Sequence, residues 1–565
     1  MSADGEPSSR VAIGIAFGNS YSSIAHTTGE GKAEVIANEE GDRQIPSILA
    51  YVDGEELQGT QAKAQLVRNP KNTVAYFRDF LGQEFKSIDP SPCHQSAHPI
   101  QSGNSIAFSI RDTEAEESNN TSVSEIATRH IRVLAASAAD FLGKSINSAV
   151  ITVPTNFSDA QKEALSKASA DAGVEVLQLI SEPVAAVLAY DARTGTDPSD
   201  KTVVVADIGG TRTDIAVVAS RGGIYTILAT AHDYEYSGTQ LDKVLVEYFA
   251  KEFLKKNKSA EDPRNNARSL AKLTLESEAV KKALSLGGSA NFSVESLSSG
   301  IDFTATINRT RYELLAGKIF AAISRLVLSV VAKAGLDPLD ISDVIMSGGS
   351  SHTPRLARNM QSTFSSAAVH APATSTEALN PSELAARGAA IQASLISDFD
   401  VEDVRESCHP VVTATAHLST ALGLLCISAD EKSHGVFVPL VEAETPVPVR
   451  RSKIFPVPGA GGDVIVKLCE GTSEVISKPV EKKTKPETNG DDDDSDDDDD
   501  SEEEEEEIKE KKWKHKATIA EAAIRGVKKG AKIEVQLNIG PDLAVTMVAR
   551  EVGGKGGVRG VVPAS

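Results

Sequence analysis

The sequence predicts an α/β fold for about the first 395 residues and a separate β module for the remainder. Up to about residue 395, short apolar runs alternate with longer amphipathic segments, as they do where strands and helices alternate along a chain. After Ser397 the segments are short and are bounded by Pro and Gly, and polar residues alternate with apolar ones, which is typical of strands. The length of 565 residues also favours several domains, because one domain usually has roughly 100 to 200.

Strands of the α/β part are expected at its apolar runs, and the helices between them have recognisable ends. The residues from Ser158 to Gln161 match a capping box, which begins a helix, and Gly173 is placed to end that helix. The strand candidates are residues 11–15, 149–153, 202–206 and 344–346.

The β module contains one clear hairpin. Residues 533–539 place four apolar side chains on one face, Gly540-Pro541-Asp542 forms the turn, and residues 543–547 return. The expected boundaries are an acidic linker at 396–410, the β module at 411–480 and 517–550, and a flexible tail at 551–565.

A charged insertion at residues 481–516 interrupts the β module. Between Asp491 and Glu507 it holds 15 acidic residues, and lysines lie at both of its edges. Such a segment cannot bury enough apolar surface to offset the entropy lost on ordering, so we expect a disordered loop. Three roles stay open: the acidic run keeps the chain soluble, folds back on its basic flanks, or binds a basic partner.

The charge balance argues against direct binding of nucleic acid. The chain has 58 basic and 80 acidic residues, whereas a surface that binds nucleic acid neutralises phosphates with Lys and Arg. No signal peptide or membrane-spanning helix is recognisable, and no membrane association is expected. The four scattered cysteines are typical of reduced cytosolic thiols rather than of a zinc site.

An internal repeat is the most informative feature of the sequence. The strand and glycine turn at residues 11–20 recur in outline at residues 203–211, and each copy leads into a second strand. Glycine lets backbone amides approach a phosphate closely, so two such turns can clamp a polyphosphate from both sides, although either copy alone fits an ordinary hairpin turn. The candidate phosphate-binding residues are Gly18, Asn19, Ser20 and Tyr21 in the first turn and Gly209, Gly210, Thr211 and Arg212 in the second.

Two acidic residues lie where chemistry on a phosphate would need them. Asp207 begins the second turn and could hold magnesium through water, whereas Ala16 takes the equivalent place in the first copy; a turn-initiating role also explains Asp207. Glu182 lies between a predicted strand and helix, next to Ser181 as a candidate cap and Pro183 in the first turn. Glu182 either positions a water or metal or favours the helix dipole.

A third glycine site and a polar helix face are candidates for binding a nucleoside. The first follows the strand at 344–346, where the backbone can approach a flat ligand. The second is one stripe of a helix at 273–286, which can reach a ribose and a base together, although a solvated Glu278–Lys282 pair also explains it. The candidates are Gly348, Gly349 and Ser350 in the loop and Glu278, Lys281, Lys282 and Ser285 on the helix.

These motifs, in this order, resemble the seventy-kilodalton heat-shock protein family. The matching landmarks are Val-Ile-Thr-Val-Pro at 150–154, Leu-Ile-Ser-Glu-Pro-Val-Ala-Ala at 179–186, Gly-Ile-Asp-Phe at 300–303 and Asn-Pro-Ser-Glu at 380–383. The resemblance implies a two-lobed, actin-like ATPase domain of duplicated ribonuclease-H-like subdomains over residues 1–395. It also implies a truncated β-sandwich domain, which in relatives binds extended peptides, and no helical lid after it.

The departures from the family pattern fall at the phosphate end of the implied ATP cleft. Ala16 stands for an aspartate, Asn19 for a threonine, Arg78 for the catalytic lysine, and Thr211-Arg212 for a glycine and a threonine. Asp207, Glu182 and Arg78 are then remnants of a catalytic set. Arginine does not give up its proton, so the resemblance implies a chain that binds ATP with little or no hydrolysis. We interpret Arg78 and Arg212 as partial substitutes for magnesium, whose presence stays open.

A lidless, hydrolysis-impaired relative with an acidic linker is similar to the atypical fungal subunit of the ribosome-associated complex. That resemblance implies a stable heterodimer with a J-domain protein such as zuotin, contact with the ribosome through this partner, and help to another heat-shock chaperone acting on nascent chains in the cytosol. Two alternatives stay open: a working chaperone ATPase that cycles on unfolded polypeptides, and, as the weakest, a small-metabolite kinase of the same superfold.

Overall fold

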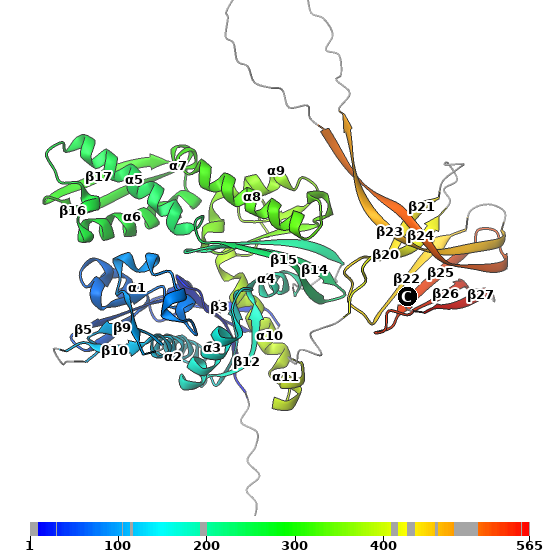
Figure 1. Ribbon diagram of the computed structural model, residues 1–565, viewed down its shortest axis with the longest axis horizontal. Helices are drawn as coiled ribbons and strands as arrows, with labels where there is room; N and C mark the ends of the chain where they lie inside the picture. Colours follow the sequence, from blue (N-terminus) through cyan, green and yellow to red (C-terminus); the bar gives the residue numbers. More distant parts are fainter. Residues whose placement is uncertain are drawn as a thin grey trace, which may run out of the picture. The chain divides into compact units, whose positions relative to one another are not determined.

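The computed structural model describes residues 10–29, 31–103, 105–113, 117–192, 200–407, 416–426, 435–457, 461–479, 507–554 and 556–563. Contacts divide the chain into two compact units, residues 1–413 and 414–565. Figure 1 shows mixed helices and strands in the first unit and strands in the second.

The first unit contains two large sheets with the same topology. The first sheet runs in the order β12-β11-β1-β2-β3, and the second in the order β15-β14-β13-β18-β19. In each, three consecutive antiparallel strands are followed by two strands that pair in parallel. The repeat in the sequence is therefore a repeat in the fold. The strands are β1 (Ala12–Ala16), β2 (Tyr21–Thr27), β3 (Ala33–Ile36), β11 (Ser148–Val153) and β12 (Glu175–Ser181), then β13 (Lys201–Ile208), β14 (Thr213–Arg221), β15 (Ile224–Asp233), β18 (Asp343–Ser347) and β19 (Ala368–His370).

The strands expected at 11–15, 149–153, 202–206 and 344–346 are confirmed as parts of β1, β11, β13 and β18. The predicted capping box is also present: Ser158 and Gln161 exchange side-chain-to-backbone hydrogen bonds at the start of α3 (Asp159–Asp171). Gly173 follows the end of that helix with φ of +85°, which glycine adopts without strain. Ser181, however, makes no side-chain capping bond, so only Pro183 is confirmed in its predicted role.

Helices and small sheets surround the two large sheets. The apolar side chains inside form one core around each sheet, for example Ile15 and Ile151 in the first and Val217 and Phe249 in the second. The remaining helices are α1 (Gly59–Ala64), α2 (Val123–Leu142), α4 (Glu182–Asp191), α5 (Gly238–Lys256), α6 (Ala267–Leu286), α7 (Arg309–Leu315), α8 (Gly317–Lys333), α9 (Pro354–Thr363), α10 (Leu384–Ile396) and α11 (Val401–Ser407). The remaining strands are β4 (Ile45–Pro46), β5 (Ile48–Val52), β6 (Glu55–Gln58), β7 (Thr73–Ala75), β8 (Pro99–Ser102), β9 (Ser105–Ile110), β10 (Asn119–Ser122), β16 (Ser289–Ser298) and β17 (Ile301–Asn308).

In the part of the chain that the structure describes, no single helix is long and apolar enough to cross a membrane. Only α7 and α8 taken together have the required length and composition, and these two helices are bent by 65°. Phe320, Ile323 and Val327 of α8 are buried in the core around the second large sheet.

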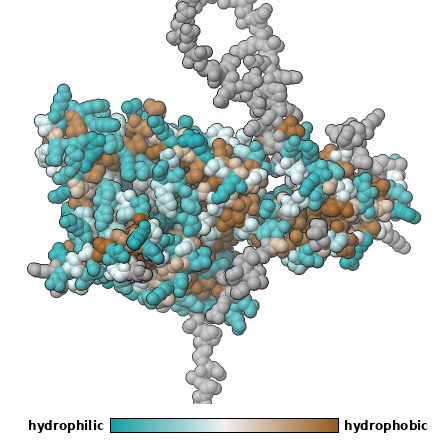
Figure 2. All heavy atoms as spheres, viewed as in Figure 1, coloured by the Kyte–Doolittle hydropathy of each residue, from teal (hydrophilic) through white to brown (hydrophobic). Residues whose placement is uncertain are grey.

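The second unit consists of two four-stranded antiparallel sheets, in the orders β21-β20-β23-β24 and β22-β25-β26-β27. Buried residues of both sheets, among them Leu424, Leu468, Val535 and Leu537, form one core. Figure 2 also shows hydrophobic residues of this unit at the surface that faces the viewer. The strands are β20 (Ala421–Cys426), β21 (Val436–Val441), β22 (Val449–Pro456), β23 (Gly462–Pro479), β24 (Glu507–Val527), β25 (Lys532–Ile539), β26 (Val545–Glu551) and β27 (Gly557–Val562). The predicted hairpin at 533–547 is confirmed by the pairing of β25 with β26.

Two boundary expectations differ from the structure. The disordered insertion was expected over 481–516, but residues 507–516 belong to β24 and pair with β23; residues 480–506 lie outside the described residues. The flexible tail expected at 551–565 contains β27, which pairs with β26. In both cases strand pairing orders residues whose composition alone indicates a loop. The linker expected at 396–410 contains the short helix α11, which is compatible with that expectation.

Candidate functional site

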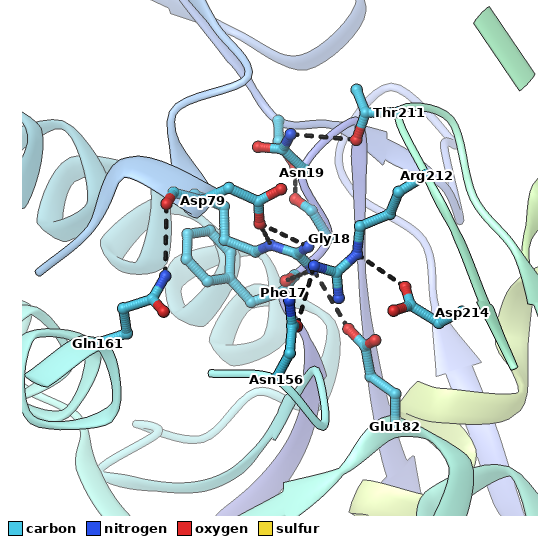
Figure 3. Close-up of polar contacts among 12 residues, drawn as sticks. Phe17, Gly18, Asn19, Asp79, Asn156, Gln161, Glu182, Thr211, Arg212 and Asp214 are labelled. Atoms are coloured by element: carbon cyan, nitrogen blue, oxygen red, sulfur yellow. Dashed lines mark hydrogen bonds and ion pairs between the residues drawn. The ribbon is translucent and has the colours of Figure 1, made fainter. Parts of the chain in front are cut away.

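The two glycine turns of the repeat meet each other. The Asn19 amide donates to the Thr211 hydroxyl at 3.1 Å, across 192 residues of sequence (Figure 3). A Cβ on Gly210 would lie 2.3 Å from the Ser20 hydroxyl, which is closer than side chains approach one another. The second turn therefore needs glycine at this point, and the fold places both turns at one site.

The third glycine site adjoins the second turn. Gly348, at the end of β18, has φ of +83°, and a Cβ there would lie 2.6 Å from an oxygen of Asp207. The Ser350 hydroxyl donates to the Gly209 carbonyl at 3.2 Å, and the Ser347 hydroxyl donates to Asp207 at 2.6 Å. The loop at 347–350 thus lines the same site as the repeat.

Arg78 is buried, and protein groups hold its guanidinium. Its Nε and Nη2 lie 2.8 and 2.7 Å from one oxygen of Asp79, while Nη1 donates to Glu182 and to the Phe17 carbonyl, each at 3.2 Å (Figure 3). Gln161 donates to the Asp79 carbonyl at 3.3 Å. Arg78 therefore bridges the first glycine turn and the start of α4, and two carboxylates balance its charge.

Arg212, in the second turn, is also buried but keeps one unused donor group. Its Nε lies 2.7 Å from Asp214, and its Nη1 donates to Asn156 at 3.2 Å (Figure 3). Nη1 also donates to the Tyr234 hydroxyl at 3.1 Å. Its Nη2 is buried without a hydrogen-bond partner among the described residues. This nitrogen can donate to an anion that enters the site.

Sequence reasoning missed Asp214, which the structure places with Asp207 and Glu182. These three carboxylates and Thr155 line a cavity of about 10 Å³, which is room for about one water molecule. Burial raises the pKa of Asp207 and of Asp214 to about 6 and also raises the pKa of Glu182. The sequence did offer one signal for Asp214: it is an acidic residue seven positions after Asp207, at the start of the strand that follows the second glycine turn.

The carboxylates do not form a direct metal cage. Among the described residues, no group of three His, Cys, Asp or Glu side chains could hold a metal ion. Asp214 binds Arg212 and Asp207 accepts from Ser347, while Ala16 has no ligand atom to offer. The residues present therefore do not fit directly coordinated magnesium, and contact of Asp207 with magnesium through water stays a prediction.

The helix predicted at 273–286 is confirmed as part of α6, while its role in nucleoside binding stays a prediction. Tyr21 reaches this helix from β2. Glu278 binds the Tyr21 hydroxyl, lies 2.9 Å from Lys282 and lies 2.5 Å from Lys63, which sequence reasoning missed. Burial opposes ionisation of Glu278, but Lys63 and Lys282 outweigh it and hold its pKa well below the usual range. The Glu278 side chain is 17% exposed and that of Lys63 is 19% exposed, whereas Lys282 is 58% exposed, so the carboxylate is largely shielded while one of its two lysine partners stays in solvent.

The other candidates on α6 hold the start of α5. Lys281 lies 2.8 Å from Asp242 and donates to the Gly238 carbonyl at 3.0 Å. The amide of Gly238 in turn donates to the Gly209 carbonyl at 3.0 Å. Ser285 donates back to the Lys281 carbonyl at 3.2 Å within the helix. Through α5, the polar face of α6 is therefore connected to the second glycine turn.

Several buried polar atoms of the two turns have no partner among the described residues. They are Asn19 Oδ1, Ser20 Oγ, Arg212 Nη2 and Asp214 Oδ1, joined by Thr152 Oγ1 on the strand position that pairs with Ala16. Leaving such an atom unpaired costs about 1–3 kcal/mol, so native proteins seldom tolerate a cluster of them unless a ligand or water completes it. The site is built to receive a polar group.

The chain is similar in sequence to several known proteins. A family model described as "Hsp70 protein" matches residues 12–483. The ribosome-associated complex subunit SSZ1 of Saccharomyces cerevisiae is 43% identical over 97% of this chain and 99% of its own length. A heat shock protein 70 homolog of Schizosaccharomyces pombe is 43% identical over 98% of this chain and 95% of its own, and the human heat shock 70 kDa protein 14 is 32% identical over 83% and 89%.

Proposed function

The chain belongs to the Hsp70 protein family, and we propose that it is an ATP-binding co-chaperone of that family with little or no ATP hydrolysis. The observation that carries this proposal is the contrast between its two buried arginines. Arg212 keeps a free donor in the site, whereas two carboxylates and a carbonyl engage Arg78. The site thus keeps a group for binding and lacks one for catalysis.

Support for ATP binding comes from both ends of the site. Arg212 Nη2 and the Ser20 hydroxyl can donate to phosphate oxygens, and a hydrogen bond from a charged donor to phosphate is among the stronger ones in proteins. The groups on α6, together with Gly348 and Gly349, would hold the adenosine end. The actin-like ATPase architecture expected for the family fits the mixed α/β structure and its duplicated sheets.

The proposed loss of hydrolysis follows from two changes. Ala16 provides no carboxylate at the end of β1, and Arg78 is fixed in ion pairs with a planar guanidinium that is not equivalent to a lysine ammonium. If each change costs about a hundredfold in rate, together they remove roughly 5 kcal/mol of transition-state stabilisation.

A single-turnover experiment with pre-bound ATP tests this function. We expect the purified chain to retain intact ATP, with or without magnesium, over times in which active relatives complete a turnover. Hydrolysis at a rate typical of the family, lost when Asp207 is changed to Ala, would contradict the proposal. Such a result would instead support the alternative function, an active chaperone ATPase. One observation favours that alternative: the cavity lined by Glu182, Asp207 and Asp214 can hold one water molecule beside three carboxylates.

We also propose that the chain works as one half of a heterodimer with a J-domain protein of the zuotin type. The support is its similarity to a protein named as a subunit of the ribosome-associated complex, over nearly the full length of both chains. In this proposal the partner contacts the ribosome, another heat-shock chaperone is stimulated, and the complex acts in the cytosol. The second unit, as a lidless β-sandwich, would grip a segment of the partner. When the full-length chain is purified from its native cells, we expect a J-domain protein to co-purify with it. Purification of the chain without a J-domain protein would contradict the proposed heterodimer.

A further inference from the structure

One buried serine holds both ends of the first glycine turn. The Ser47 amide donates to the Ser20 carbonyl at 3.0 Å, and the Ser47 hydroxyl donates to the Gly18 carbonyl at 2.8 Å. Ser47 follows β4, which pairs with the start of β2, and it is 1% exposed. A single residue, 29 positions after Gly18, thus fixes two carbonyls of the turn.

Fixing these carbonyls also fixes the direction of two amides. In a planar trans peptide the C=O and the following N–H point to opposite sides. Because the Gly18 and Ser20 carbonyls face Ser47, the N–H groups of Asn19 and Tyr21 point away from it. Backbone amides are the groups that a glycine turn offers to phosphate. The Ser47 contacts therefore determine where two of these donors point.

A chain of buried polar groups extends behind Ser47. Its hydroxyl lies 2.9 Å from the Ser22 hydroxyl, which lies 3.1 Å from Nε2 of His130 on α2. Nδ1 of His130 lies 3.1 Å from the side-chain oxygen of Gln58, whose amide nitrogen donates to Glu56 at 2.8 Å. His130 is fully buried, and its ring lies 5.9 Å from each of the Phe17 and Phe77 rings.

Counting hydrogens assigns the direction of these contacts. The Glu56 contact turns the Gln58 oxygen toward His130, so Nδ1 of His130 carries the hydrogen and Nε2 accepts. Burial lowers the pKa of His130 to about 4, so the ring is neutral near pH 7. Ser22 then donates its single hydrogen to Nε2, and Ser47 donates its own to the Gly18 carbonyl. The two donations run in opposite directions, one to His130 and one to the glycine turn, so the Ser47 contacts alone act on the turn.

We propose that Ser47 is a positioning residue that presets the first glycine turn for phosphate. This inference rests on the proposed ATP binding and adds to it the groups that orient the donors. Because Ser47 acts on the phosphate end alone, its loss should weaken binding of ATP and leave binding of adenosine unchanged. General destabilisation of the unit would instead weaken both.

Affinities of the full-length chain for ATP and for adenosine, measured by calorimetry, test the inference. Ser47→Ala is expected to weaken ATP binding about tenfold, since it removes the hydrogen bond to the Gly18 carbonyl. Ser22→Ala should leave ATP affinity unchanged, because the Ser22 hydroxyl donates to His130 rather than to the turn. Adenosine affinity should not change in either variant. The matched control is Thr128→Ala. This change removes a buried hydroxyl on α2 that donates to the Ala168 carbonyl and takes no part in the contacts at the glycine turn. It should leave both affinities unchanged.

The possible outcomes distinguish a failure of the positioning role of Ser47 from a failure of the proposed ATP binding. If the unmodified chain does not bind ATP, the proposed function fails. If it does bind ATP and Ser47→Ala binds ATP equally well, or loses ATP and adenosine affinity to the same extent, the positioning role is wrong. Should Ser47→Ala not fold, Ser47→Cys, whose thiol is a much weaker donor than the hydroxyl, decides by the same ratio of ATP to adenosine affinity.

Discussion

Replacing Arg212 by Ala is expected to destabilise the first unit by about 3–5 kcal/mol and to weaken ATP binding about ten- to a hundredfold. The stability loss follows because the change leaves Asp214 buried without the cation that balances it, and breaking one side of a buried ion pair costs this much. The affinity loss follows because Arg212 Nη2 is the unpartnered cationic donor of the site. Chemical denaturation and calorimetry measure the two effects separately.

A double variant, Arg212→Ala with Asp214→Asn, distinguishes the two roles of the arginine. Removing both charges should restore most of the stability, because a neutral amide no longer needs a buried counter-ion. ATP affinity should stay low, since neither substituted side chain offers a positive charge to phosphate. Recovery of both properties in the double variant would show that Arg212 only balances Asp214 and does not bind nucleotide. An unchanged ATP affinity in Arg212→Ala alone would show the same.

Local patterns were enough to predict the elements that hold the site. The two copies of strand, glycine turn and strand are readable because hydrophobic runs and glycines lie within ten residues of each other. The duplicated sheets then follow, since each turn lies between two paired strands. The helix with Glu278 and Lys282 was readable for the same reason: its polar stripe is local in sequence.

The partners of the site residues were not predictable in the same way. Lys63 and Glu278 are 215 residues apart, and Arg78 and Glu182 are 104 apart, so no periodicity connects them. Asp79 was overlooked because its role is to pair with Arg78, whose side chain folds back toward it within a short turn. Contacts of this kind are set by the packing of whole sheets and helices, which a single sequence does not encode in any local pattern.

The ordered length of the hairpin β23–β24 shows a second limit of what the sequence alone can predict. Composition predicted disorder up to residue 516, because lysines and glutamates dominate that segment. Lys514 and Lys516, however, lie 3.1 and 3.5 Å from Glu474 and Glu470 across the paired strands. Opposite charges that face each other across a ladder stabilise it modestly, and backbone pairing supplies the rest. Charge content alone therefore overestimates disorder where a complementary strand is available.

Changing Gly388 to Ala is expected to destabilise the first unit by about 4 kcal/mol or more, although alanine is the better helix former. Gly388 lies in α10, where a Cβ would be 1.9 Å from the Ala185 carbonyl of α4. Helix α10 packs on the first large sheet through Ala386 and Ala390, and α4 packs on the second through Val187. Backbone must move apart to admit even one methyl group, so the contact that joins the two sheets is lost.

The sign of the change makes this test decisive, because helix propensity and packing predict opposite results. In a helix that touches nothing at the glycine, alanine should stabilise by about 0.5–1 kcal/mol through lower backbone entropy in the unfolded chain. Gly317, the first residue of α8, is the matched control, since a Cβ there has no atom within 4 Å. Chemical denaturation of Gly388→Ala and Gly317→Ala should give changes in unfolding free energy of opposite sign. Equal, small gains would mean that α10 and α4 do not approach at Gly388.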